Sequence, residues 1–442
     1  MKTQKLLILF LAAVLGFTSC RRTDDEEIIV PPKAPETING EITANKTLTA
    51  DRVWYLDGVV LVKNNATLTV EAGTVVRAKI GTKAALVIDK GSKLIADGTV
   101  TKPIVFTSGK DAGARTPGDW GGIILVGKAP TNRTTPVQVE GGVALTYGTD
   151  NVPADNSGTL RYVRIEYAGI GVNDSEINAL TFYAVGSGTI VENVQTVYAN
   201  DDAYEFFGGT VNCKNLIAFG TADDDFDFDF GFNGSLQFGL ALRDPKFVDA
   251  ADDGNGIECD NDKDGTDATP ITQPKLSNLT LIGPNNAANT ASRHAYGNRW
   301  RRGAKFIFNN SIILGNQKGG LNIESDKSAN FYKNGDSQFK NNIVAPFGVP
   351  FLVTATTLTA AEMQVKALAD GNLIIADANV SLKLTNPFSL TGPNFLPATG
   401  SPALAGTFVA TPNATAVTYR GAFGTTDWTA GWANWDAQNT KY

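Results

Sequence analysis

The sequence predicts an all-β solenoid, a parallel β-helix in which short strands stack coil upon coil. Three observations predict it. Val, Ile, Thr, Phe and Asn dominate the ordered-looking stretches, and the chain has 45 Gly but only 2 Met and 1 His, a composition that favours strands and tight turns. The strands are short and end in Gly-centred turns, so they are stable only when they stack. A pattern of strand and acidic turn also recurs with a period near 22 residues.

The start of the chain differs from the rest. Basic residues precede an apolar run, residues 6–17, that ends in Phe17-Thr18-Ser19-Cys20. This order is typical of a secretory signal, and the run is too short for a permanent membrane helix. We expect residues 1–19 to be a signal peptide, residues 20–37 a flexible acidic and Pro-containing tether, and residues 38–442 the β-helix domain.

The position of Cys20 resembles that in the signals of bacterial lipoproteins. The resemblance implies a mature chain that begins at Cys20 and carries lipid on its sulfur and its amine. No Asp follows Cys20 directly, and the acidic run Asp24–Glu27 resembles the export signal of surface lipoproteins in Bacteroidota. This implies an outer-membrane lipoprotein exposed on the cell surface; the alternative for the acidic run is a solvated tether alone.

The strands follow in order. Residues 68–76, 86–99 and 103–108 alternate apolar and polar side chains. The insert 115–157 is either a loop across the helix or an edge that covers a groove. The clearest repeat aligns Asp201–Glu205 with Asp223–Asp227.

The Asn residues of this repeat share the same offset, with Asn193 aligned on Asn215. We expect these Asn to stack at the bends of successive coils and to bond to neighbouring backbone. Residues 276–281 and 308–314 restate the strand, and residues 256–260 resemble 320–325. Only residues 357–369 predict a short helix.

Longer motifs resemble a family of right-handed β-helix lipoproteins in Bacteroidota. These motifs include GDWGGIILVGKAP, EFFGGTVN and the terminal YRGAFGTTDWTAGWANW, and the resemblance covers most of residues 40–442. It implies a right-handed single-stranded β-helix with loop insertions and a C-terminal cap at about 415–442 over the open edge of the last coil. Trp428, Trp432 and Trp435 belong to this cap or form an exposed sugar platform. The wider pectate-lyase-like class contains polysaccharide lyases, hydrolases and carbohydrate binders, which is an analogy at the level of the fold.

Acidic residues make the main candidate site. Between residues 201 and 267 there are 17 carboxylates and 4 basic residues. Stacked coils lie about 4.8 Å apart, so carboxylates at equivalent positions repel unless a cation or raised pKa values relieve them. Ca²⁺ suits oxygen ligands of this kind, and the alternative is that these Asp residues hydrogen-bond turns on a solvated edge. The candidate Ca²⁺ ligands are Asp201, Asp202, Glu205, Asp223, Asp224 and Asp227.

A second acidic segment matches the opening of a calcium loop. Asp260, Asp262 and Asp264 precede Gly265 in the pattern D-x-D-x-D-G, but Ile271 stands where the bidentate Glu of an EF-hand is required. A complete EF-hand is therefore excluded. A partial Ca²⁺ site and a plain acidic loop remain as alternatives.

Basic and aromatic residues cluster after the acidic segments. Arg side chains beside aromatic rings can stack on sugars or clamp a carboxylate, which predicts a subsite for an anionic glycan. The alternative is that these residues neutralise the acidic segments. The candidate ligand-binding residues are Arg293, Tyr296, Arg299, Trp300 and Arg301.

These observations favour a lipid-anchored surface protein that binds a ligand or acts as a scaffold. Its predicted partners are a glycan or an outer-membrane uptake protein, and the net charge of −7 argues against nucleic acid. The alternative is a Ca²⁺-dependent polysaccharide lyase or another glycan-degrading enzyme. In a lyase, Asp223, Asp225 and Asp227 would hold the ion and Arg243 or Arg301 would be the base. No motif anchors a catalytic set.

Two further cysteines lie in strand-like segments. In an oxidising compartment Cys213 and Cys259 are either a disulfide or two buried free thiols, and the second interpretation is favoured.

Overall fold

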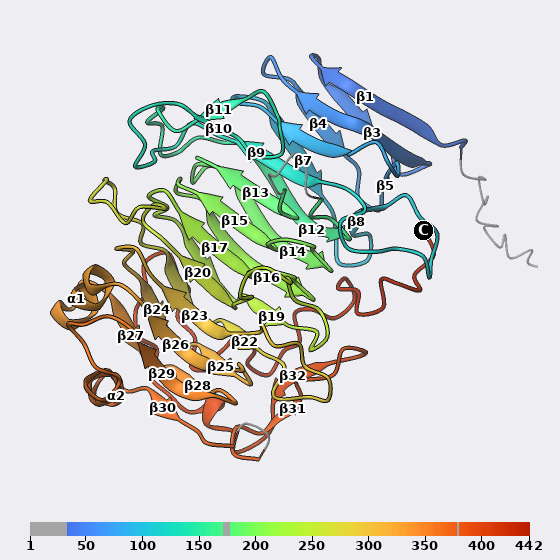
Figure 1. Ribbon diagram of the computed structural model, residues 1–442. Coiled ribbons are helices and arrows are strands. Elements are labelled where there is room, and N and C mark those ends of the chain that lie inside the picture. The colour runs from blue at the N-terminus through green and yellow to red at the C-terminus, as the bar shows by residue number, and fades with distance from the viewer. Residues whose placement is uncertain (1–32, 171–176, 378–379) are drawn as a thin grey trace, which may run out of the picture. The chain divides into compact units, whose positions relative to one another are not determined.

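The computed structural model describes residues 33–170, 177–377 and 380–442. Cys20 and the predicted signal peptide lie outside these residues. Ala34–Tyr442 forms a compact unit with its own core. It is the predicted right-handed parallel β-helix: 28 strands form one continuous sheet in which every pairing is parallel (Figure 1). Only two small antiparallel ribbons, β10–β11 and β31–β32, stand apart from this sheet among the described residues.

The continuous sheet folds into three rows of stacked strands, and each coil contributes to row III, then row I, then row II. β1 (Glu36–Ile42) and β3 (Val53–Val62) begin rows I and II together. Row I continues with β5 (Val75–Ala78), β8 (Ile104–Ser108), β12 (Gly158–Glu166), β14 (Ile190–Val197), β16 (Asn212–Phe219), β19 (Leu240–Leu242), β22 (Thr280–Ile282), β25 (Ile312–Leu314), β28 (Ile343–Ala345) and β30 (Leu373–Ile374).

Row II contains β6 (Ala85–Ile88), β9 (Gly122–Val126), β13 (Leu180–Tyr183), β15 (Tyr204–Phe207), β17 (Phe226–Asp229), β20 (Ile257–Cys259), β23 (Tyr296–Trp300), β26 (Gly319–Ile323) and β29 (Val349–Val353). Row III contains β2 (Lys46–Leu48), β4 (Thr67–Val70), β7 (Lys93–Asp97), the first halves of β12, β14 and β16, then β18 (Ser235–Gln237), β21 (Lys275–Ser277), β24 (Ile307–Asn309) and β27 (Gln338–Lys340).

The strand register confirms the repeat expected from the sequence. Glu205 on β15 pairs with Asp227 on β17, one sequence period later. Leu276 on β21 pairs with Phe308 on β24, as the later restatement predicted. Each coil therefore places residues of equivalent sequence position directly above one another.

Apolar side chains fill the inside of the coils as ladders. Phe182, Phe206 and Phe228 stack with ring centroids 4.6 and 4.9 Å apart, which adds aromatic stacking to the area that they bury. Cys213 and Cys259 also point into this core, and both are free thiols. The interpretation as two buried thiols is confirmed, and the disulfide is excluded.

The corner between rows III and I is built on left-handed backbone. Asn193 and Asn215 have φ values of 54° and 55° and lie one coil apart. Asn tolerates this conformation better than other non-glycine residues. The corner ladder consists of Tyr162, Asn193, Asn215, Phe238, Asn278, Asn310 and Asn341, all with positive φ.

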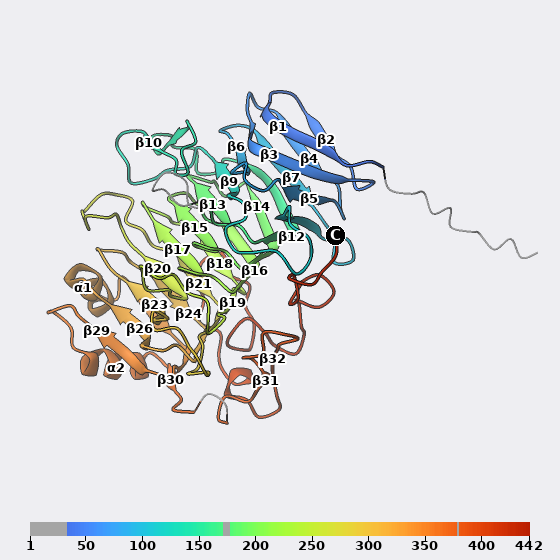
Figure 2. The same ribbon diagram turned by 45° about the vertical axis from the view of Figure 1, so that its right-hand side comes forward.

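The C-terminal segment does not take the predicted place over the open edge of the last coil. It runs back along the flank of the coils, and Gln195, Gln237 and Asn310 in three different coils hold its backbone (Figures 1 and 2). The reason lies in row I, whose strands from β16 onward are largely apolar on both faces. Its outward residues, including Ile217 and Leu314, are buried with Trp432 in a second hydrophobic cluster.

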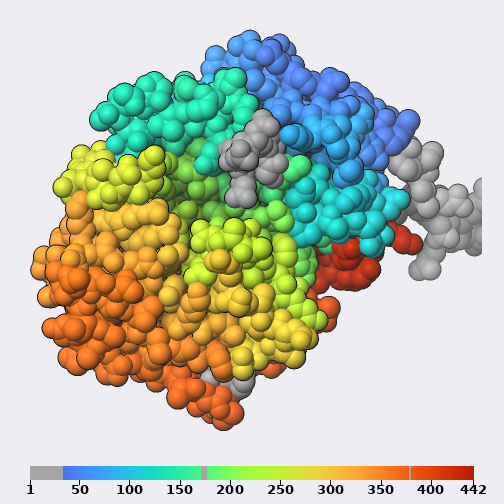
Figure 3. Space-filling view, viewed as in Figure 1, coloured from blue at the N-terminus to red at the C-terminus, as the bar shows by residue number. Residues whose placement is uncertain are grey.

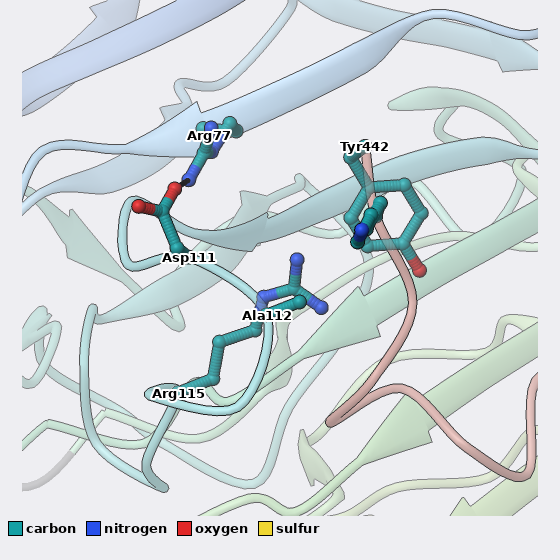
Figure 4. Close-up of a pocket in the computed structure, with 6 residues that line it drawn as sticks. Arg77, Asp111, Ala112, Arg115 and Tyr442 are labelled. Atoms are coloured by element: carbon teal, nitrogen blue, oxygen red, sulfur yellow. Dashed lines mark hydrogen bonds and ion pairs between the residues drawn. The ribbon is translucent and has the colours of Figure 1, made fainter.

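The end of this segment is held near the first coils. Arg115 is 3% exposed, donates to the carbonyl of Ala437 and lies 4.8 Å from the ring centroid of Tyr442. Figure 4 shows Arg115 and Tyr442 beside the ion pair of Arg77 with Asp111. In Figure 3 the red C-terminal segment is seen next to the cyan segment around residue 110.

The insert 115–157 covers the outer face of row II in the early coils. It carries the ribbon of β10 (Val137–Gln138) and β11 (Thr146–Tyr147). Tyr147 packs against Tyr183 and Phe207 in a third hydrophobic cluster. The insert therefore excludes solvent from the start of row II, and the outward face beyond Phe207 carries charged residues.

Helices are few, as expected. α2 (Ala360–Ala369) follows β29 and confirms the one helix predicted. α1 (Asp326–Asn334), between β26 and β27, was not predicted. α2 begins with a capping box between Thr359 and Glu362. The remaining short elements are β31 (Leu384–Asn386), β32 (Asn394–Pro397) and a 3₁₀ turn at Pro402–Leu404. None of the helices in the described part of the chain is long and apolar enough to cross a membrane.

Candidate functional site

The outward face of row II carries a ladder of polar residues. Thr181, Glu205, Asp227, Glu258 and Arg299 occupy equivalent positions on β13, β15, β17, β20 and β23. Their neighbours along each strand, such as Phe206 and Phe228, point into the core. Because side chains alternate along a strand, the apolar ladder inside fixes the charged ladder outside.

The turns that precede these strands bring further carboxylates to the ladder. Asp201, Asp202 and Asp223 offer oxygens that lie within 4.8 Å of one another, and so do Asp202, Glu205 and Asp227. Two oxygens that both bind Ca²⁺ at about 2.4 Å are at most about 4.8 Å apart. The predicted acidic ligands of the two coils are therefore brought together by the fold, with Asp202 shared by both groups.

Two of the Asp residues also hold the turns. Asp202 Oδ1 accepts a hydrogen bond from the backbone N–H of Asp224 at 2.8 Å. Asp224 Oδ1 in turn accepts from the backbone N–H of Asn255 at 2.7 Å. This is the turn-forming role expected as the alternative to cation binding, and it occupies one oxygen of each side chain.

Other carboxylate oxygens of the ladder are less well satisfied. Asn178 donates to Glu205. Asp227 Oδ1 is buried, and no hydrogen-bond partner for it is found among the residues that the structure describes. Burying a carboxylate oxygen without a partner is unfavourable, so at this atom the ladder lacks a hydrogen-bond donor or a cation.

Electrostatics around the ladder disfavour charge. Burial, followed by repulsion from Asp252 and Glu258, raises the pKa of Asp223 to about 7. Burial also raises the pKa of Glu258 to about 7, against the pull of Arg301. Burial and then neighbouring carboxylates raise the pKa values of Asp202, Asp224, Glu205 and Asp227 well above their usual range. A bound cation would reverse these shifts.

The next coils neutralise their own carboxylates. Arg299 donates to Glu258 at 2.9 Å and to Glu324 at 2.8 Å. Arg301 forms ion pairs with Glu258 and Asp260. This end of the ladder is therefore charge-balanced, while the end at Glu205 and Asp227 is not.

Neither of the two carboxylate groups contains Asp260, Asp262 or Asp264, the residues of the segment with the calcium-like spacing. Asp260 is held by Arg301 and by Arg302, whose Nη1 lies 2.6 Å from Asp260 Oδ2. Against the effect of burial, hydrogen bonds from the hydroxyl of Thr266 and from the backbone N–H groups of Thr266 and Asp264 lower the pKa of Asp262. The D-x-D-x-D-G pattern forms a local turn here, which is the common structural use of such Asp residues.

The predicted basic and aromatic subsite is largely taken up by structural contacts. Trp300 is fully buried and stacks on Phe306 with centroids 4.4 Å apart. Tyr296 is 9% exposed. Arg293 pairs with Asp253 at 3.5 Å on the surface. Because Arg299 and Arg301 are engaged as described, the structure favours the alternative in which these residues neutralise the acidic segments.

Two further side chains that could take part in catalysis, Arg243 and His294, are buried. Arg243 is 3% exposed and pairs with Asp225 at 3.4 Å. His294 is 1% exposed, and burial, followed by the charge of Arg243, lowers its pKa to about 3. Neither side chain is placed to reach a large substrate.

With the coil and its polar face established, the comparison with known families is decisive. Residues 40–390 match the family model described as a pectate-lyase like beta helix domain. The chain belongs to this family. No curated protein and no solved structure was found to match it significantly.

Within this pectate-lyase-like β-helix, two acidic residues that belong to the ladder or act on it were not identified from the sequence. Glu258 is one coil beyond Asp227, but a longer loop separates the two than in the preceding coil, so the sequence period did not reveal it. The resemblance of residues 256–260 to 320–325 was the usable signal. Glu140 acts on Glu205 through its charge, and it comes from the insert, where no repeat could have placed it.

Proposed function

We propose that this protein is a lipid-anchored surface protein that binds Ca²⁺ on row II and uses this face to bind a glycan. The observation that carries the proposal is the group of Asp202, Glu205 and Asp227, whose oxygens lie within 4.8 Å of one another. Hard oxygen ligands without His or thiol suit Ca²⁺. A bound Ca²⁺ has coordination positions left for sugar hydroxyl or carboxylate oxygens.

The test compares binding with and without the ion. The purified protein is titrated with Ca²⁺ and, separately, incubated with neutral and anionic polysaccharides in Ca²⁺ or chelator. We expect Ca²⁺ to raise the melting temperature and polysaccharide binding to disappear with chelator. Unchanged melting in Ca²⁺ would overturn the proposal, and binding to an outer-membrane protein in place of any glycan would redirect it.

A double variant identifies the site. Glu205→Gln with Asp227→Asn removes two charges from the group and should abolish the Ca²⁺-dependent shift. The matched control is Asp97→Asn with Glu192→Gln, two exposed carboxylates that both pair with Arg161 on row III. The control should retain the full shift, because these side chains lie on a different row from the proposed ligands.

The second candidate is a Ca²⁺-dependent polysaccharide lyase or another glycan-degrading enzyme. Asp223 and Glu258, with pKa values of about 7, favour it, because a general base works best when its pKa lies near the working pH. Arg301, one of the two Arg residues expected as a base, is less suited because its carboxylate partners raise its pKa. Release of unsaturated products in Ca²⁺ but not in chelator would establish the lyase.

The anchor is proposed from Cys20 and the residues before it. Expression of the Cys20→Ser variant in a bacterial host should move the protein from the membrane fraction to the soluble fraction. Protease treatment of intact cells should digest the wild-type protein if it is exposed on the surface. A Cys20→Ser variant that stays in the membrane fraction would argue against lipid attachment at this residue.

A further inference from the structure

Two bulky residues, Tyr162 and Phe238, take the place of Asn in the corner ladder between rows III and I. Phe238 has a φ of 60° and stands between Asn215 and Asn278 in neighbouring coils. A bulky side chain in this conformation is a genuine outlier, and such backbone strain is destabilising. Asn would relieve it, as it does in the adjacent coils. The ring of Phe238 packs against the second hydrophobic cluster, and it also forms one wall of a cavity.

Phe238 lines a cavity of about 250 Å³ between the corner and the C-terminal segment. Tyr419 faces Phe238 with centroids 6.4 Å apart. Trp428 forms another wall, and its position is set by stacking on Phe423 at 5.3 Å and on Trp432 at 6.3 Å. The remaining lining residues are Asn215, Gly424, Thr425 and Thr426. No acidic or basic side chain is among the described residues that line this cavity.

The polar groups around the cavity are free to bind a ligand. Within the described part of the chain, no hydrogen-bond partner is found for the side-chain amide of Asn215, the hydroxyl of Tyr419 or those of Thr425 and Thr426. In the later coils of the ladder the equivalent amides are used, since Asn278 donates to the carbonyl of Tyr419 at 3.0 Å and Asn310 donates to that of Val409 at 2.8 Å. Among the described residues, Asn215 shares this unused amide with Asn193 one coil earlier, and it is Asn215 that lines the cavity.

We propose that this cavity binds one ring of a neutral sugar within a glycan. A sugar ring combines apolar C–H faces with hydroxyl groups that donate and accept, and the cavity offers aromatic walls with an amide and hydroxyls. Its volume lies below the roughly 300–1,000 Å³ of pockets for drug-sized ligands, which fits one ring better than several. The uncharged lining distinguishes this ligand from an anionic sugar.

This site is separate from the proposed Ca²⁺ site. It lies at the corner of rows III and I, whereas the carboxylates lie on row II, and it contains no carboxylate. Binding here should therefore persist in chelator. If row II fails to bind Ca²⁺, the proposal for the cavity stands unchanged.

The experiment measures tryptophan fluorescence and calorimetric titration of the purified protein in chelator. The probes are cellohexaose, mannohexaose, xylohexaose and maltohexaose, with hexagalacturonate as the anionic comparison. We expect at least one neutral probe to bind with perturbation of Trp fluorescence, and hexagalacturonate to bind more weakly. Failure of all four neutral probes to bind at about 10 mM would overturn the proposal.

The decisive variant is Phe238→Asn. It restores the Asn of the neighbouring corners, and the relief of the left-handed backbone offsets the lost packing of the ring, so we expect little change in melting temperature together with at least about a tenfold loss of sugar affinity. A purely structural role for Phe238 predicts the opposite pattern, a lower melting temperature with affinity intact. That result would overturn the proposal.

Two smaller changes test the polar groups. Asn215→Gly and Tyr419→Phe each remove one free group without filling the cavity, and each should weaken binding several-fold. Asn193→Gly is the matched control, because Asn193 has the same left-handed backbone one coil earlier and does not line the cavity. Equal effects of Asn193→Gly and Asn215→Gly on affinity would contradict the assignment.

Discussion

Glu205 and Asp227 lie directly opposite each other on neighbouring parallel strands, with both side chains on the outer face of row II. Asp202 brings a third carboxylate, so that oxygens of all three lie within 4.8 Å of one another. No Arg or Lys in the described residues forms an ion pair with any of the three, whereas Glu258, one coil further on, is paired with Arg299 and Arg301. A regular stack of coils has thus brought carboxyl groups together without a basic partner at one place and paired them with Arg at the next.

The metal-free protein should lose stability as the pH rises. Burial and repulsion raise the pKa values of Asp223 and Glu258 to about 7, from 3.8 and 4.5. The folded state therefore holds these protons more tightly than the unfolded chain, and stability falls from about pH 4 to about pH 7. In chelator, we expect a lower melting temperature at pH 7.5 than at pH 5.5. The Glu205→Gln/Asp227→Asn variant should show a flatter profile, and a wild-type melting temperature that rises with pH would contradict this.

Arg301 should be far more important for stability than its neighbour. Its side chain is 16% exposed and pairs with Glu258 and Asp260, which are 10% and 7% exposed. Arg301→Met leaves both carboxylates short of a partner, and we expect a loss of about 3–5 kcal/mol in the free energy of unfolding. Arg302→Met is the control, because Arg302 is 41% exposed and should cost less than about 1 kcal/mol. Denaturant unfolding measures both, and similar losses would refute this account.

The aromatic ladder inside the coils should be sensitive to truncation. Phe206 is 1% exposed and stacks between Phe182 and Phe228. Phe206→Ala should lower the free energy of unfolding by about 3–5 kcal/mol through lost contacts and a cavity. Phe347 is 52% exposed, and Phe347→Ala should change stability by less than about 0.5 kcal/mol. Equal effects in a denaturation series would show that the ladder is not packed as described.

The two core thiols should be unreactive in the folded protein. Burial raises the pKa of Cys213, and that of Cys259 is raised by burial and by nearby carboxylates. Since the thiolate is the reactive form, iodoacetamide should label neither residue under native conditions and both in denaturant. Peptide mass mapping distinguishes them from Cys20. Rapid native labelling of Cys259 would mean that row II opens to solvent.

Much of the coil could be predicted because the residues that form it recur at a fixed interval in the sequence. The shared offset of the repeat placed Glu205 against Asp227 and Asn193 against Asn215, and both pairings are present. The helix at Ala360–Ala369 follows from its own capping residues and composition. In a parallel β-helix each strand pairs with its equivalent one coil away, so a sequence period translates directly into spatial neighbours.

The rest was decided by the tertiary structure. The interval from Asp227 to Glu258 is longer than the sequence period, and that from Glu258 to Arg299 is longer still. Loops of different length lie between these coils, and they conceal the ladder in the sequence. The path of the C-terminal segment along row I depends on apolar outer residues such as Ile217, which any covering segment could have buried.

The sequence by itself determined the coil and its acidic turns, because both follow from local repeats. Only the folded chain decided which carboxylates are neutralised and where Phe238, Tyr419 and Trp428 enclose a cavity. Both of these depend on contacts between residues far apart in the chain.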